Sequence, residues 1–219
     1  MEVYDLDPSR ATDRFNSGVE NQQQYQTAGL KASVNPHAPY SVSYALWELL
    51  VNHFGNHTIT MHNQETKDEN DFFETKTGSF LGMYERTKVS LDFFNPTGKT
   101  SVQSMLPYLQ KAHSGILVHN SFTSVNDVRV VNQTMQNAFW CLCPNANQYI
   151  EQTMPPIELL RSENANIILG TDSYASNWSL SILDEMKTIQ KHLPHLPLTE
   201  LLTWSTINGA KALQMSDQL

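Results

Sequence analysis

Three side chains with the chemistry of metal ligands each stand just beyond a different short apolar run of this 219-residue sequence: His62, His119 and Asp172. Imidazole nitrogens and carboxylate oxygens are the ligands that hydrolytic zinc sites use. Such a site also needs a group that moves protons, and Glu65 follows His62 closely along the chain. The shared position of these residues therefore predicts a hydrolytic metal site.

Each of these residues also has a simpler interpretation. A single histidine at the end of a strand is more often a structural residue than a ligand. Glu65 precedes a charged stretch that begins at Lys67, so it fits a solvated loop as well as it fits a catalytic role. The recurrence of the pattern after successive apolar runs is what favours a site.

The apolar runs alternate with segments whose apolar residues recur at helical spacing. This alternation is typical of βα units with a parallel sheet, and such sheets gather their active-site residues at the carboxyl ends of the strands. The predicted fold class is therefore α/β, with parallel strands that are each followed by a helix. Residues 1–6 are a candidate additional strand. The other predicted strands span 31–35, 58–62, 115–119, 139–143 and 166–171.

The composition excludes several classes of protein. With 14 Lys and Arg against 22 Asp and Glu, the chain carries a formal charge of −8, which argues against non-specific binding to nucleic acid or anionic lipid. No apolar run approaches the ~18 residues of a membrane span, and the N-terminus lacks the anatomy of a signal peptide. Two cysteines cannot build a disulfide scaffold, so we expect a reducing, cytoplasmic location. We also expect Cys141 and Cys143 to be packing residues that point to opposite faces of one strand.

Five short blocks of the sequence resemble those of the amidohydrolase superfamily and follow that family's order. Within the superfamily they look like the branch of cytosine and guanine deaminases, adenosine-type deaminases and triazine chlorohydrolases. The blocks are Pro36-His37-Ala38-Pro39-Tyr40, His62-x-x-Glu65, Leu117-Val118-His119-Asn120, Cys143-Pro144 and Leu169-Gly170-Thr171-Asp172-Ser173.

The resemblance implies a metal-dependent hydrolase that is built on a (β/α)₈ TIM barrel and uses one divalent ion, zinc or iron. By position, His62 and Asp172 match metal ligands, and Asp172 also matches the residue that takes a proton from water. Glu65 matches the family's proton-shuttling glutamate, and His119 matches the histidine that orients water or substrate. His37 matches a substrate-contacting histidine of the adenosine-type deaminases.

Two features that this resemblance leads us to expect are missing from the sequence. It contains no His-x-His pair, which would supply two more ligands from the first barrel strand, and nothing that matches the family's small β-sandwich domain. We therefore predict that residues 1–219 form a single domain, the C-terminal portion of a barrel from about its third strand to its eighth. The partial barrel should not close, and we expect these residues alone to be inactive.

The predicted function is hydrolysis of a C–N bond in a cyclic amidine or related group by metal-activated water. Deamination of a purine-like or other nitrogen heterocycle is the favoured form of this reaction. The predicted partner is a small-molecule substrate, with no nucleic acid and no membrane, and a homo-oligomer stays open. Two alternatives remain: a non-catalytic fragment or binding module with an incomplete metal site, and a chlorohydrolase or cyclic amide hydrolase on the same scaffold.

Overall fold

The computed structural model describes residues 1–218, in which all strand pairing is parallel. The strands are β1 (Glu2–Val3), β2 (Asn35–Pro36), β3 (Thr58–Asn63), β4 (Ser114–His119), β5 (Ala138–Leu142) and β6 (Ile167–Leu169). Four of them form a sheet in the order β3–β4–β5–β6, and β1 pairs with β2. The N–H of His62 donates to the carbonyl of His37 (2.8 Å), which links the end of β3 to the residue after β2.

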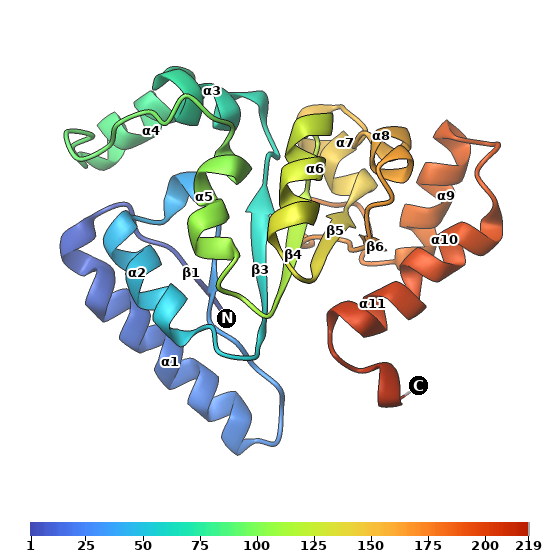
Figure 1. Ribbon diagram of the computed structural model, residues 1–219, viewed down its shortest axis with the longest axis horizontal. Coiled ribbons are helices and arrows are strands. Elements are labelled where there is room, and N and C mark those ends of the chain that lie inside the picture. The colour runs from blue at the N-terminus through green and yellow to red at the C-terminus, as the bar shows by residue number, and fades with distance from the viewer. Residues whose placement is uncertain (219) are drawn as a thin grey trace.

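At least one helix follows every strand. Figure 1 shows the strands in the middle of the molecule, with α1 and α2 at one end and α9 to α11 at the other. The helices are α1 (Ala11–Thr27), α2 (Tyr44–His53), α3 (Lys67–Thr75), α4 (Phe80–Thr87), α5 (Ser101–Leu109), α6 (Val125–Thr134), α7 (Pro144–Glu151), α8 (Ile157–Ser162), α9 (Ile182–His192), α10 (Leu198–Ser205) and α11 (Ile207–Ala212). Within residues 1–218, none of the helices combines the length and the apolar character that crossing a bilayer requires.

The predicted fold class is confirmed, and four of the five main predicted strands lie close to their predicted positions. The strand predicted at 31–35 differs, because pairing in this segment begins only at Asn35. Side chains replace part of the backbone ladder there. Ser33 Oγ donates to the carbonyl of Thr58 (3.0 Å), and Asn35 Oδ1 accepts from the N–H of Thr60 (3.2 Å).

The side chains of the four-stranded sheet divide between two faces, because neighbouring parallel strands in register point their paired residues the same way. On the outer face Met61 pairs with Leu117 and Leu117 with Trp140, and all three are buried together with Trp47 of α2. A smaller apolar cluster covers the inner face. Its buried members are Ile116, Phe139, Cys141, Cys143, Ala146, Ile168 and Ala212.

The two cysteines share this inner face, so the prediction that they point to opposite faces was wrong. Residues two positions apart in a strand lie on the same side. A Cβ atom on Gly170 would stand 2.7 Å from Cys141 Sγ and 3.2 Å from Cys143 Sγ, so both sulfur atoms approach the same point. Both thiols are free and buried, as expected for packing residues.

Because of this contact, glycine is the only residue type that fits at position 170 without displacing a sulfur atom. Gly170→Ala should lower the free energy of unfolding by about 1–3 kcal/mol, the usual effect of overpacking a core. Adding Cys141→Ala in the same chain should recover part of that loss, because it removes the closer sulfur atom. Urea denaturation of the two single variants and the double variant measures this coupling.

Gly209→Ala is the matched control, because Gly209 lies in α11 and a Cβ there would meet nothing within 4 Å. It should leave the stability unchanged or raise it by up to ~1 kcal/mol, as alanine favours helix. Strict additivity of Gly170→Ala and Cys141→Ala would contradict the packing argument.

Candidate functional site

Three of the predicted site residues meet at the carboxyl ends of β3, β4 and β6. The ligand atoms of His62, His119 and Asp172 all lie within 4.8 Å of one another. His119 is buried, whereas His62 and Asp172 are partly exposed, so a small molecule can reach the group. Two imidazoles and one carboxylate match the three protein ligands of catalytic zinc sites, so these residues fit a divalent ion.

An unusual backbone conformation brings His119 into this group. Regular alternation along β4 would send its side chain to the outer face, with Leu117. Instead His119 has a φ of 76° and Asn120 a φ of 61°, both in the left-handed region that residues with a Cβ seldom adopt. The turn of the backbone directs the imidazole toward His62, whose Nδ1 lies 3.0 Å from His119 Nε2.

Asn147 of α7 fixes which nitrogen of His119 carries the proton. Its Oδ1 accepts from His119 Nδ1 (2.8 Å), and its Nδ2 donates to the His119 carbonyl (3.5 Å), which orients the amide. In a neutral ring the lone pair is therefore on Nε2, which faces the site. The carboxylate of Glu65 lies 3.6 Å from the same Nε2. Glu65 thus belongs to the group, although its surroundings in sequence also fitted a solvated loop.

His62 lies between carboxylates. Its Nε2 is 3.2 Å from Oε1 of Glu2, the first residue of β1. Burial acts to lower the pKa of His62, but the hydrogen bond to Glu2 and the charges of Glu2, Glu65 and Asp172 outweigh it and raise the pKa. The same hydrogen bond lowers the pKa of Glu2. Sequence reasoning missed Glu2, because nothing near residue 2 indicates that its strand ends beside His62.

His37 lies on the other side of His62, with 4.8 Å between the ring centroids. Its Nδ1 lies 2.7 Å from Ser41 Oγ, and Ser41 Oγ itself donates to the carbonyl of Ala38 (3.2 Å). Because the hydroxyl proton is used in this way, His37 Nδ1 donates and its Nε2 is left with the lone pair. Burial, followed by the charge of His62, lowers the pKa of His37 and so favours this neutral form.

Asp172 is held in the loop after β6. Its φ is 57°, again in the left-handed region, and its Oδ2 accepts a hydrogen bond from Ser176 Oγ. Asn177 stabilises this loop by donating to the carbonyl of Thr171 (2.7 Å) and to the buried Glu185 (2.7 Å). The other oxygen of Glu185 accepts from the N–H of Asn145 (2.8 Å), which ties the loop after β5 to the loop after β6.

A second buried carboxylate supports the loop that carries Glu65. Glu69 of α3 is completely buried, and its Oε1 accepts from the N–H of Gln64 (2.9 Å) and from Ser101 Oγ (2.5 Å). Gln64 has a φ of 47°, and its carbonyl accepts from the N–H of Phe122 (3.0 Å). Within residues 1–218, Glu69 Oε2 has no hydrogen-bond partner. Burial raises the pKa of Glu69 to about 7, against the opposing effect of its hydrogen bonds.

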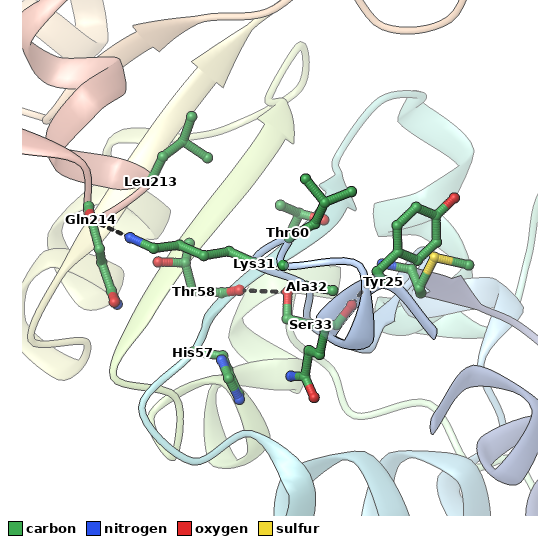
Figure 2. Close-up of a pocket in the computed structure, with 13 residues that line it drawn as sticks. Tyr25, Lys31, Ala32, Ser33, His57, Thr58, Thr60, Leu213 and Gln214 are labelled. Carbon is green, nitrogen blue, oxygen red and sulfur yellow. Dashed lines mark hydrogen bonds between the residues drawn. The ribbon is translucent and has the colours of Figure 1, made fainter. Parts of the chain in front are cut away.

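A large cavity lies away from the candidate site. It has a volume of about 760 Å³ and lies at the opposite end of β3, next to Thr58 and Thr60. Figure 2 shows Lys31 extended across it toward Gln214, whose carbonyl accepts from Lys31 Nζ (3.1 Å). Neither the predicted site residues nor Glu2 line this cavity, so its volume is not an indication of the reacting centre.

Comparison with known proteins identifies the family. The model that describes the amidohydrolase family matches residues 7–219. The chain belongs to the amidohydrolase family. Adenosine deaminase of Helicobacter pylori is 26% identical over 221 residues, which cover 98% of this chain and 52% of that protein. The family that the sequence resemblance predicted is therefore confirmed.

Solved structures agree with this assignment. A crystal structure of aminofutalosine deaminase from Helicobacter pylori has a TM-score of 0.83 at 26% identity, and the match covers 97% of this chain and 54% of that chain. An adenosine deaminase from Xanthomonas campestris, solved with bound zinc, has a TM-score of 0.67 at 21% identity over 94% of this chain and 44% of that chain, which shows the fold alone. The chain spans about half the length of the relatives it matches, and its parallel sheet is part of a TIM barrel.

The buried Glu69 gives the stability a specific dependence on pH. Its pKa of about 7 lies above the ordinary value of 4.5, so between these values the folded chain holds a proton that the unfolded chain releases. The Glu69 contribution to stability therefore falls as pH rises from about 4.5 to about 7, by up to ~3 kcal/mol at ~1.4 kcal/mol per pKa unit. Glu69→Gln cannot ionise and should lack this component.

Urea unfolding of both proteins at several pH values tests this. As the pH increases from about 4.5 to about 7, the unfolding free energy of the wild type should fall relative to that of Glu69→Gln. Glu20→Gln, at an exposed position of α1, is the control and should follow the wild-type curve. Parallel curves for wild type and Glu69→Gln would mean that Glu69 titrates normally.

Proposed function

We propose that this site belongs to a metal-dependent hydrolase that deaminates a purine-like or other nitrogen heterocycle. The observation that supports this most directly is the convergence of His62, His119 and Asp172, with Glu65 beside His119. A group of ligands with an adjacent, non-coordinating carboxylate is what hydrolytic deamination requires, because the reaction needs both a nucleophilic water and a proton donor.

His62 and Asp172 would hold the divalent ion, zinc or iron. The chemistry that such an ion supplies is a water of lowered pKa, able to act as a nucleophile near neutral pH. The lone pair of His119 Nε2 faces the site without any rearrangement of the ring, because Asn147 already holds the other ring nitrogen.

The protons would move through two carboxylates. Asp172 would accept a proton from the attacking water, and the hydrogen bond from Ser176 Oγ to its Oδ2 would hold the carboxylate in position. Glu65 would protonate the ring nitrogen next to the carbon that is attacked. The proton that Asp172 accepted would then pass to the amino group, which would leave as ammonia. Glu69 helps to position Glu65, because it accepts a hydrogen bond from the backbone N–H of Gln64, the residue before Glu65.

The remaining histidines would position the reactants. His119 Nε2, with its lone pair directed into the site, would accept a hydrogen bond from the attacking water and so orient it. His37, neutral and with its lone pair on Nε2, would contact the substrate. The relatives named as adenosine and aminofutalosine deaminases suggest a purine nucleoside as substrate. We further propose that the six strands correspond to the third to eighth strands of the barrel.

The roles of Asp172 and Glu65 can be separated by substitution. Asp172→Asn should weaken zinc binding by more than ~100-fold, since loss of a ligand exceeds the ~10–100-fold effect of an outer-shell change. Glu65→Gln should leave zinc affinity within about two-fold of wild type, and in a preparation that deaminates a purine nucleoside it should lower kcat by ~10²–10⁴-fold. Competition with a chromophoric chelator and ammonia release measure the two effects.

Asp13→Asn, at an exposed position of α1, is the control for loss of one negative charge. Loss of zinc in Glu65→Gln would make Glu65 a ligand, and full activity would return it to the solvated loop. A chain that binds neither zinc nor iron(II) would favour the non-catalytic alternative. The cytoplasmic location, a homo-oligomer and the inactivity of residues 1–219 alone stay predictions.

A further inference from the structure

Glu2 enters the site from a strand that carries none of the predicted site residues. Its neighbour Val3 is buried in the outer core, and β1 pairs Glu2 with Asn35 of β2. Alternation along the strand therefore directs the Glu2 side chain to the inner face, toward the histidines. There Glu2 Oε1 lies 3.2 Å from His62 Nε2.

The two nitrogens of His62 face different partners. Nδ1 faces His119 Nε2 at 3.0 Å, on the side where Asp172 completes the ligand group. Nε2 faces Glu2, and a carboxylate accepts hydrogen bonds but cannot donate one. Nδ1 also faces an acceptor, the lone pair of His119 Nε2, but that acceptor is neutral whereas Glu2 is charged. Because a charged acceptor forms the stronger hydrogen bond, the proton of the neutral ring belongs on Nε2, and the lone pair on Nδ1 points toward His119.

We propose that Glu2 is a positioning residue for His62, which it holds with the proton on Nε2 so that Nδ1 is presented to the metal. The inference rests on the proposed function, because it deepens the role of the same site. Histidines that bind metals commonly donate their other N–H to a carboxylate, which fixes the tautomer, orients the ring and increases the basicity of the ligating nitrogen.

The geometry separates this role from that of a direct ligand. Glu2, His37 and His62 also have ligand atoms within 4.8 Å of one another, so Glu2 could in principle bind an ion on its own side of His62. An ion bound there would use His62 Nε2 as a ligand, and Nε2 would first have to lose its proton. The hydrogen bond at 3.2 Å favours the positioning role, in which that proton stays in place.

The first measurement is the zinc affinity of the full chain, with zinc as the only ligand added. Glu2→Ala should weaken zinc binding by ~10–100-fold, the usual effect of removing an outer-shell carboxylate. Glu2→Gln should lie between wild type and Glu2→Ala, because its amide oxygen still accepts from Nε2 but carries no charge. Glu20→Ala is the matched control at an exposed position of α1 and should leave the affinity unchanged.

A second measurement does not depend on metal. The ¹⁵N chemical shifts of His62, recorded without zinc at a pH where the ring is neutral, report its tautomer. Wild type should be mainly the Nε2–H form, Glu2→Ala should contain a larger share of the Nδ1–H form, and Glu20→Ala should match wild type. A general structural disturbance would alter many resonances, whereas this role predicts a change centred on His62.

The outcomes separate the two proposals. Unchanged tautomers in Glu2→Ala, or an unchanged zinc affinity despite altered tautomers, would overturn the positioning role. Loss of one of two bound zinc equivalents in Glu2→Ala would overturn it as well, in favour of a direct ligand. If wild type binds no zinc while Glu2→Ala still shifts the tautomer, the proposed function fails and the effect of Glu2 on His62 stands.

Discussion

The candidate site depends on a backbone constraint that recurs where strands end. Gln64, His119 and Asp172 have φ values of 47°, 76° and 57°, in the left-handed region. Each such conformation costs on the order of 1–2 kcal/mol, so it persists only where other contacts hold it. For His119 these contacts are the two hydrogen bonds of Asn147 and the bond from the N–H of Asn120 to the carbonyl of Asn63, the last residue of β3 (2.9 Å). The gain is that a side chain due to enter the apolar core is turned toward the site.

Buried carboxylates hold these strained loops from the outside of the site. Glu69 binds the N–H of Gln64, and Glu185 binds the N–H of Asn145 and the amide of Asn177. Burial raises the pKa of both carboxyl groups, so this support is obtained against a desolvation penalty. Loops secured by hydrogen bonds to α3 and α9 are less free to move than loops that only contact solvent. The side chains of the proposed site are therefore held in place by the helices that surround the sheet.

Features that depend on local sequence pattern, such as the strands, could be predicted from the sequence. Features that depend on contacts between distant segments could not. The strand that ends in His62 and the one that ends in His119 follow from apolar runs bounded by polar residues. The segment at 31–35 was less accurate, because side-chain hydrogen bonds there replace the backbone pairing that an apolar run suggests. Glu2 has no local signal at all: its meeting with His62 depends on how β1 and β3 are placed in the barrel.

Carboxylates surround the three histidines of the proposed site, and their negative charge favours a cation there. The ring centroids of His37 and His62 are 4.8 Å apart and those of His62 and His119 are 5.1 Å apart, so His62 is the central ring of the three. Burial lowers the pKa of His37, whereas Glu2 and its neighbouring carboxylates raise that of His62. Positive charge thus concentrates on the central ring. A divalent ion bound at His62 Nδ1 in place of a proton would be attracted by the same carboxylates, so the arrangement that favours an imidazolium would also favour the ion.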